Sequence, residues 1–222
     1  QFSSDYIKTQ RLAVFGLGES SIQERVNKHY PDWPDDVELG FRASMPVLEV
    51  KLTTRGQDAS KKIDEWRGKI IDLIDDHLLG DMPLNLAQSV VAAAKQHKLS
   101  ICTAESCTGG RIAAELTGVA GSSEVFPGGI VSYSNALKQQ LLGVSESSLN
   151  TDGAVSKSVV KQMAEGALNT VGADLVIAVT GIAGPDGGSE DKPVGTVWLA
   201  WGSRENLKIE KFFLPVDRHL FQ

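Results

Sequence analysis

Apolar and polar residues alternate over the first eighty residues in the pattern of a small α+β domain. An apolar run at residues 12–15 predicts a strand. Alternating stretches at 37–43 and 47–53 predict two more strands, which residues 44–46 join as a hairpin. Residues 31–36, rich in proline and aspartate, predict the loop that precedes this hairpin.

Two helices complete this first segment. Ser20 or Ser21 stands where it can cap a helix that runs through Val26. Asp58 stands where it can cap a longer helix, which Gly80 ends. The apolar residues of the longer helix recur at helical spacing: Ile63, Trp66, Ile70, Ile71, Ile74 and Leu78. The predicted order over residues 1–80 is therefore β-α-β-β-α.

Strands alternate with helices from residue 84 onward, after a break at 81–83. The predicted strands are residues 99–102, 128–133, 175–179, 195–201 and 207–213. The predicted helices lie around residues 86–94, 112–116, 136–142 and 159–171, with Ser134 or Asn135 capping the third and Ser156 the fourth. This alternation predicts an α/β fold, in which a mostly parallel sheet carries helices on both faces in three layers. We expect two domains, residues 1–80 and residues 84–222.

The turn around Ser106 carries the first candidate chemistry. Residues 103–111 lie between a predicted strand and a predicted helix, which places the Ser106 hydroxyl at the end of a sheet beside the N–H groups of a helix start. Such donors can hold a phosphate, or the oxyanion that forms when a carbonyl is attacked. Ser106 or Thr108 can equally serve as a plain helix cap. From this turn alone both interpretations stay open.

A serine nucleophile needs a base, and the histidines do not supply one. His29 and His77 lie in the other segment, His97 ends a helix behind the strand, and His219 lies in the tail. Lys138, in the first turn of its helix, is the candidate, because burial there would leave its amine neutral and able to accept the serine proton. Tyr133 ends the preceding strand and can point to the same place. The alternatives are a solvated helix lysine and an edge aromatic.

Composition narrows the function classes. The formal net charge of −6 argues against broad binding to nucleic acid or membrane surfaces. The β-α-β-β-α order is shared with KH-type RNA-binding modules, but the basic Gly-x-x-Gly loop of such modules is absent from residues 1–80. No apolar run reaches the length of about eighteen residues that a membrane span needs. Cys102 and Cys107 flank the turn, a poor place for a disulfide, which favours a reducing cytoplasm.

Metal and nucleotide motifs are weak in this sequence. The spacing of the cysteines and histidines fits no common metal site, so we expect no metal and no cofactor. The glycine-rich loop 180–188 lacks the lysine of a P-loop, but its N–H groups can hold one phosphate. The alternative is an ordinary surface loop. The residues alone therefore indicate a hydrolase or nucleotide-binding α/β domain.

Four motifs in order resemble the CinA family. They are residues 104–110 (AESCTGG), 129–135 (GIVSYSN) with Lys138, 180–188 (TGIAGPDGG) and 192–197 (KPVGTV). The resemblance is to the C-terminal domain of that family, the nicotinamide-nucleotide amidohydrolase, and covers residues 84–222. The first eighty residues are similar to the KH-like middle domain of longer CinA proteins. The N-terminal molybdopterin-binding-like domain of those proteins has no counterpart here, and because the chain begins with Gln1 we expect a fragment.

The resemblance implies hydrolysis of nicotinamide mononucleotide to nicotinic acid mononucleotide and ammonia. It implies that Ser106 is the nucleophile, assisted by Tyr133 and Lys138, in a homodimer. We expect the turn residues Thr108, Gly109 and Gly110 to contact the substrate. We expect the phosphate to lie against Arg111 and the loop residues Thr180, Gly181, Ile182, Ala183 and Gly184. The alternatives are a non-catalytic nucleotide-binding or regulatory module and a small RNA-linked adaptor.

Overall fold

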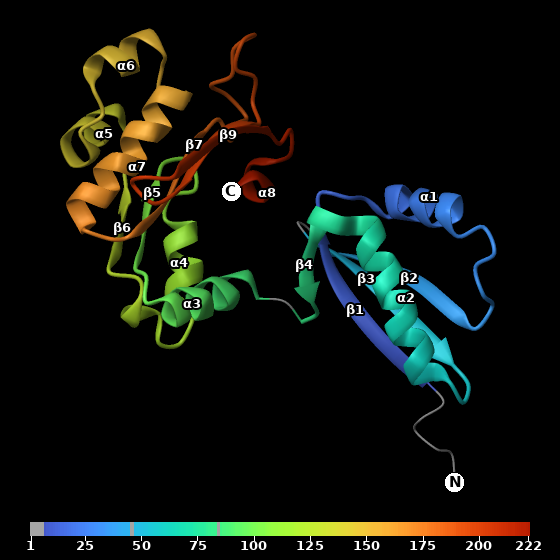
Figure 1. Ribbon diagram of the computed structural model, residues 1–222. Helices are drawn as coiled ribbons and strands as arrows, with labels where there is room; N and C mark the ends of the chain where they lie inside the picture. The colour runs from blue at the N-terminus through green and yellow to red at the C-terminus, as the bar shows by residue number, and fades with distance from the viewer. Residues whose placement is uncertain (1–6, 45–46, 84) are drawn as a thin grey trace. The chain divides into compact units, whose positions relative to one another are not determined.

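The computed structural model describes residues 7–44, 47–83 and 85–222 (Figure 1). The chain divides into two compact units, Gln1–Asn85 and Leu86–Gln222, and each has its own sheet. We call them unit 1 and unit 2. The proposed division into a KH-like domain over residues 1–80 and an amidohydrolase domain over residues 84–222 stays a prediction.

Unit 1 is an antiparallel sheet with two helices. Its elements are β1 (Ile7–Phe15), α1 (Glu19–His29), β2 (Val37–Ser44), β3 (Val47–Arg55), α2 (Ala59–Ile74), a 3₁₀ turn (Asp75–His77) and β4 (Leu78–Asp81). The strands lie in the order β2-β3-β1-β4, and every pairing is antiparallel. The three predicted strands and two predicted helices are confirmed, and β4 is an addition.

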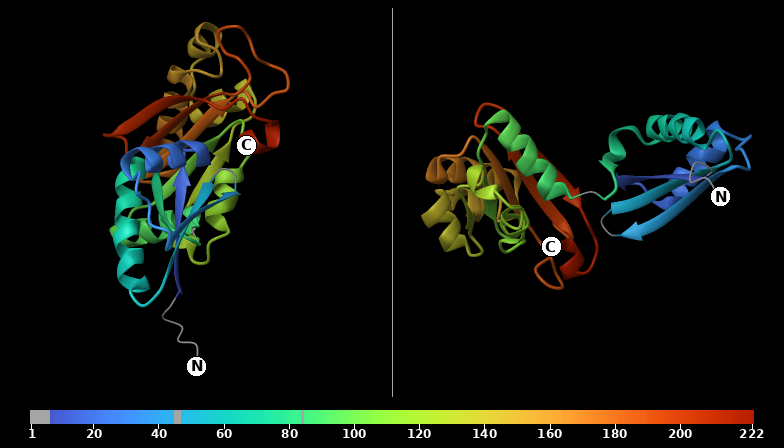
Figure 2. Two further views of the ribbon diagram at one scale, coloured as in Figure 1. Left: turned by 90° about the vertical axis from the view of Figure 1, so that its right-hand side faces the viewer. Right: turned by 90° about the horizontal axis from the view of Figure 1, so that it is seen from below.

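One face of this sheet carries the core of unit 1. Side chains alternate along a strand, so Leu12 and Val14 of β1 share a face with Val50 and Leu52 of β3. Both helices pack on that face, as the right-hand view of Figure 2 shows. Their buried residues are Ile22 and Val26 of α1 and Ile63, Trp66, Ile70 and Ile74 of α2. The predicted apolar positions of the long helix are thereby confirmed, except Ile71, which is half-buried, and Leu78.

The prediction that the long helix continues to Gly80 is wrong. Helix α2 ends at Ile74, where Asp75 has a φ of 42°, and Leu78 belongs to β4. The register pairs Leu78 with Val14 and Gly80 with Ala13. The backbone of these residues therefore bonds to the edge of β1, a long-range partner that helical periodicity does not reveal.

Two predicted turn features of unit 1 also differ. Helix α1 has Gly18 at its N-cap, so neither Ser20 nor Ser21 caps it. Asp58 does hold the N-cap position of α2, but its side chain makes no capping hydrogen bond. The centre of the predicted hairpin turn, residues 45–46, lies outside the described residues, and the flanking strands β2 and β3 pair as a hairpin requires.

Unit 2 is an α/β unit around a five-stranded sheet. Its helices are α3 (Leu86–His97), α4 (Arg111–Thr117), α5 (Asn135–Leu142), α6 (Glu146–Thr151), α7 (Lys157–Val171) and α8 (Arg218–Phe221). Its strands are β5 (Ile101–Glu105), β6 (Gly128–Val131), β7 (Leu175–Gly181), β8 (Thr196–Gly202) and β9 (Leu207–Phe213). In the order β6-β5-β7-β8-β9, the first three strands are parallel and the last two form an antiparallel hairpin. The α/β prediction is confirmed.

Helices cover both faces of this sheet (Figure 1). Cys102 and Ala104 of β5 point to the face on which α7 packs, together with Val176 and Ala178 of β7. The intervening residues of the same strands point to the opposite face and pack with α3 and α4. The three-layer arrangement is therefore confirmed.

Several local predictions in unit 2 are confirmed. Ser134 caps α5 and Ser156 caps α7, each by accepting a hydrogen bond from the N–H three residues later. Gly143 and Gly172 end these helices in the left-handed conformation. The first strand of the unit is displaced from its predicted bounds, because β5 begins at Ile101 and ends at Glu105. Helix α6 was not predicted.

Candidate active site

Ser106 and Lys138 lie side by side at the ends of the parallel strands. Ser106 directly follows β5, and Lys138 lies in the first turn of α5. The Lys138 Nζ is 2.9 Å from the Ser106 Oγ and donates to the main-chain oxygen of Ser132 at 2.7 Å. The two side chains are almost inaccessible, with exposed fractions of 8% for Ser106 and 1% for Lys138. The structure thus brings together the predicted nucleophile and its predicted base.

Burial makes Lys138 an unusual lysine. Desolvation lowers its pKa from 10.5 to about 8, and the neighbouring Cys107 acts weakly in the opposite direction. Within the described residues no carboxylate forms a salt bridge with the Lys138 amine. A substantial fraction of Lys138 is therefore neutral near pH 7–8, so its amine can accept a proton from the serine hydroxyl.

The backbone around the pair is held by the neighbouring strands. The Ser106 N–H donates to the Val179 oxygen of β7 at 3.1 Å. The Ser132 N–H donates to the Glu105 oxygen at 2.8 Å, and the Ser132 oxygen accepts from Lys138. The ends of β5, β6 and β7 therefore fix the nucleophile and its lysine, as expected for a site at the carboxyl edge of such a sheet.

Tyr133 contacts Lys138 through its backbone. Its main-chain oxygen lies 3.4 Å from the Lys138 Nζ. Tyr133 is 59% exposed, and its hydroxyl accepts a hydrogen bond from Arg218 at 3.0 Å. The phenol is therefore placed next to Arg218, a residue that the sequence analysis did not single out.

Arg218, at the start of α8, joins two of the sequence motifs. One end of its guanidinium donates to the Tyr133 hydroxyl and the other to the Gly184 oxygen at 2.7 Å. Gln222 follows in the same segment and donates to the Cys107 oxygen at 2.7 Å. A guanidinium has five N–H donors, so Arg218 can hold these two partners and still bind an anion.

The turn after Ser106 is organised around Glu105. Its carboxylate accepts hydrogen bonds from the Thr108 hydroxyl and from the N–H of Gly110, among others. The Gly109 N–H donates to the Ser106 oxygen at 3.1 Å. Two N–H groups of the turn, those of Cys107 and Thr108, take no part in the hydrogen bonds just described. Sequence reasoning missed Glu105, because its donors, the Thr108 hydroxyl and backbone N–H groups, converge on the carboxylate only once the turn has folded.

Arg111 and the 180–184 loop differ in how they are held. Arg111 is exposed, and its guanidinium makes a long contact of 3.4 Å with the Thr108 oxygen. Thr180 donates its hydroxyl to the Ala154 oxygen at 2.9 Å. Ile182 uses both backbone groups to bond the segment that opens β8.

The remaining loop positions differ in the space around them. A Cβ on Gly181 would lie 3.0 Å from the Thr196 oxygen, so a side chain there would be tightly packed. Gly184 contacts Arg218 through its main-chain oxygen, and Ala183 and Gly184 are both buried.

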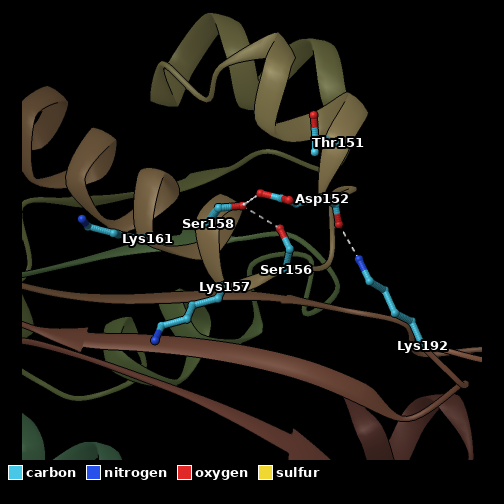
Figure 3. Close-up of a pocket in the computed structure, with 7 residues that line it drawn as sticks. All are labelled: Thr151, Asp152, Ser156, Lys157, Ser158, Lys161 and Lys192. Carbon is cyan, nitrogen blue, oxygen red and sulfur yellow. Dashed lines mark hydrogen bonds between the residues drawn. The ribbon is translucent and has the colours of Figure 1, made fainter.

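A separate cavity of about 660 Å³ lies beside the start of α7 (Figure 3). It is lined by Thr151, Asp152, Ser156, Lys157, Ser158, Lys161 and Lys192. Asp152 accepts hydrogen bonds from Ser158 and Lys192. Figure 3 shows the three lysine side chains pointing in different directions, and none of the predicted site residues lines this cavity.

The described residues contain neither a metal-binding cluster nor a membrane-spanning helix. Over residues 7–44, 47–83 and 85–222, no group of three or more His, Cys, Asp or Glu is arranged to hold a metal ion. In the same ranges no helix combines the length and the apolar character of a membrane span.

Sequence comparisons place the chain among CinA proteins. The family model of the CinA C-terminal domain matches residues 84–222. The chain is 50% identical over 215 residues to a CinA-like protein of Colwellia psychrerythraea, which covers 96% of this chain and 50% of that protein. It is 38% identical over 209 residues to a CinA-like protein of Shewanella loihica, with coverages of 94% and 49%. The chain spans about half the length of the curated relatives it matches.

Solved structures give the same result. The competence/damage inducible protein CihA from Agrobacterium tumefaciens is 45% identical, with a TM-score of 0.60 over 61% of this chain and 84% of that chain. A competence-damaged protein (CinA) superfamily protein from Escherichia coli is 34% identical, with a TM-score of 0.60 over 62% of this chain and 80% of that chain.

Proposed function

The chain belongs to the CinA family, and we propose that it is an amidohydrolase that converts nicotinamide mononucleotide and water to nicotinic acid mononucleotide and ammonia. The observation that carries the proposal is the buried pair of Ser106 Oγ and Lys138 Nζ, 2.9 Å apart. A buried lysine of lowered pKa beside a serine hydroxyl is suited to acyl transfer. The motif resemblance supports the substrate.

The reaction proceeds through an acyl-enzyme. The neutral Lys138 amine takes the proton of Ser106, whose oxygen attacks the carboxamide carbon and forms a tetrahedral intermediate. The N–H groups of Cys107 and Thr108 stabilise the oxyanion. The C–N bond then breaks, and Lys138 returns the proton to the leaving nitrogen, which departs as ammonia. Water, deprotonated by Lys138, hydrolyses the ester and frees the acid and Ser106.

The remaining predicted residues position the nucleotide. The backbone of Thr108, Gly109 and Gly110 borders the reacting amide. The phosphate lies against the loop residues Thr180, Gly181, Ile182, Ala183 and Gly184. Arg218 serves as the phosphate cation in place of the expected Arg111, because it bonds to Gly184 of the loop and to Tyr133, whereas the Arg111 guanidinium contacts the Thr108 oxygen at 3.4 Å. Tyr133 then acts by holding Arg218.

The rest of the chain has supporting roles in this proposal. The first eighty residues form a KH-like linking domain that takes no part in the hydrolysis. The resemblance supports a homodimer. The two cysteines favour the cytoplasm, the net charge of −6 argues against nucleic acid as a substrate, and the reaction requires no metal or cofactor.

The experiment that tests the proposal is release of ammonia from nicotinamide mononucleotide in metal-free buffer. We expect turnover by the parent chain and by the control Ser147→Ala, an exposed serine, and loss of at least about 10³-fold in Ser106→Ala. Activity that survives Ser106→Ala would refute the acyl-enzyme. Absence of turnover in the parent, together with binding of the nucleotide, would favour the non-catalytic module.

A further inference from the structure

Glu105 is a fully buried carboxylate next to the proposed nucleophile. It ends β5 with an exposed fraction of 0%. One oxygen accepts from the Thr108 hydroxyl at 2.7 Å, the Gly110 N–H at 2.9 Å and the Ile112 N–H at 3.1 Å. The other accepts from the Ala113 N–H at 2.8 Å. Four donors thus converge on a single side chain.

The hydrogen-bond donors that surround the Glu105 carboxylate are neutral backbone N–H groups and a hydroxyl. Within the described residues no lysine or arginine forms a salt bridge with it. A buried anion is tolerated when hydrogen bonds replace its water, and here N–H groups at the start of α4 supply them. The Glu105 carboxylate therefore binds the N–H groups at the start of α4, where the sequence predicts a phosphate or an oxyanion.

These bonds fix both sides of Ser106. The carboxylate holds the turn at Thr108 and Gly110 from within, and the Gly109 N–H closes the turn onto the Ser106 oxygen. The main-chain oxygen of Glu105 binds the N–H of Ser132, whose own oxygen accepts from Lys138. A change at Glu105 is thus transmitted to the nucleophile through the turn that follows it.

We propose that Glu105 is the positioning residue of the Ser106 turn, which keeps the serine oxygen within reach of the Lys138 amine. The inference rests on the proposed function, because it assumes a nucleophilic Ser106. It assigns Glu105 no contact with substrate. A misplacement of about 1 Å at a reacting group is enough to reduce a rate about 100-fold, so a residue with this role has a kinetic signature.

The test compares Glu105→Gln with Glu115→Gln, an exposed glutamate of α4 that serves as the matched control. Two readouts are taken: the rate at which a sulfonyl fluoride labels Ser106, followed by mass spectrometry, and kcat and KM for nicotinamide mononucleotide. Glutamine keeps the size of the side chain but turns an amide NH₂ toward N–H donors. We expect labelling and kcat to fall together by about 10–100-fold, with KM changed less than about threefold.

Thr108→Val provides a second variant if Glu105→Gln does not fold. It removes one donor and leaves the carboxylate and the other three bonds in place. We expect a smaller decrease of about 3–10-fold in labelling and kcat. Both rates should be parental in Glu115→Gln.

Three outcomes overturn the positioning role. They are parental labelling in folded Glu105→Gln and Thr108→Val, a lowered unfolding temperature with unchanged labelling and kcat, and a parent chain whose Ser106 is not labelled at all. A fourth outcome separates the two proposals. If Ser106 is labelled in the parent and more slowly in Glu105→Gln, but the parent does not hydrolyse nicotinamide mononucleotide, the proposed substrate is wrong and the positioning role stands.

Discussion

The two units bury polar groups in different ways. In unit 1 the buried Glu49 lies 3.5 Å from Arg11, and the buried Thr54 hydroxyl donates to the Ala59 oxygen. These groups have ordinary partners and support the fold. In unit 2, within the described residues, the buried Lys138 amine donates its hydrogen bonds to a hydroxyl and to carbonyl oxygens, and its pKa is lowered to about 8. A buried cation without a neighbouring anion lowers the stability of the folded chain. Buried groups with shifted pKa values of this kind are typical of functional sites.

The largest expected effect comes from removing the Lys138 amine. Lys138→Met keeps the length and the apolar stem of the side chain, so we expect the fold to persist and hydrolysis to fall by about 10³-fold or more. The measurement is ammonia release from nicotinamide mononucleotide, with circular dichroism to verify folding. In the parent, kcat/KM should rise with pH through about 8, because only the neutral amine accepts the proton.

Lys161→Met is the control for this change, since Lys161 lies exposed on α7. It should hydrolyse the substrate at the parental rate with the same pH profile. Equal activity in Lys138→Met and the parent would mean that the buried lysine has only a structural role, like the polar groups of unit 1.

A substitution in the core of unit 1 tests the other half of the comparison. Trp66 is 8% exposed, and its ring packs against Trp33 at 4.5 Å and Tyr30 at 5.4 Å between centroids. We expect Trp66→Ala to destabilise unit 1 by about 3–5 kcal/mol. Calorimetry on the whole chain would detect the change. Hydrolysis at temperatures below the shifted transition should be unchanged, and a parallel loss there would make the site depend on unit 1.

Arginine–carbonyl bonds occur in both units and give a third contrast. Arg25 donates to the Leu73 oxygen in unit 1, and Arg218 donates to the Gly184 oxygen in unit 2, both at 2.7 Å. If Arg218 holds the phosphate, Arg218→Gln should raise KM about tenfold and leave kcat within about threefold. Steady-state kinetics decide this, with Arg25→Gln as the matched control. Equal KM values in the two variants would remove Arg218 from the substrate site.

Features that depend on neighbouring residues were predictable from the sequence. Ser134 and Ser156 cap helices through an N–H three residues away, so the spacing in the sequence contains the whole interaction. The approach of Ser106 to Lys138 spans 32 residues, yet it was expected because both follow strands whose ends share one edge of a sheet.

Features that depend on distant partners were not predictable. The bonds of Arg218 reach across 34 and 85 residues, and no local pattern marks the residue as part of a site. Glu105 stands in the motif, but its role depends on N–H groups of the turn and helix that follow it in the chain. The apolar pattern predicts helix where β4 lies, because Leu78 continues the helical spacing of α2.

The smallest expected effect is on stability, and its sign differs from that of most core substitutions. The pKa of Lys138 is about 8 in the folded chain and 10.5 in its ordinary state. One pKa unit corresponds to about 1.4 kcal/mol, so below pH 8 burial of this cation costs the folded state about 3 kcal/mol. Lys138→Met removes that cost but also the bonds to Ser106 and Ser132, worth about 1–2 kcal/mol together.

We therefore expect Lys138→Met to be more stable than the parent by about 1–2 kcal/mol at pH 7. Between pH 8 and pH 10.5 the unfolded parent binds more protons than the folded parent, so the stability of the parent rises with pH through this window. The advantage of the variant should shrink over the same window and reverse above it. Urea unfolding of both proteins at pH 7, 9 and about 11 measures the difference. A difference that does not change with pH would mean that Lys138 is not destabilised as a buried cation, and the contrast with unit 1 would disappear.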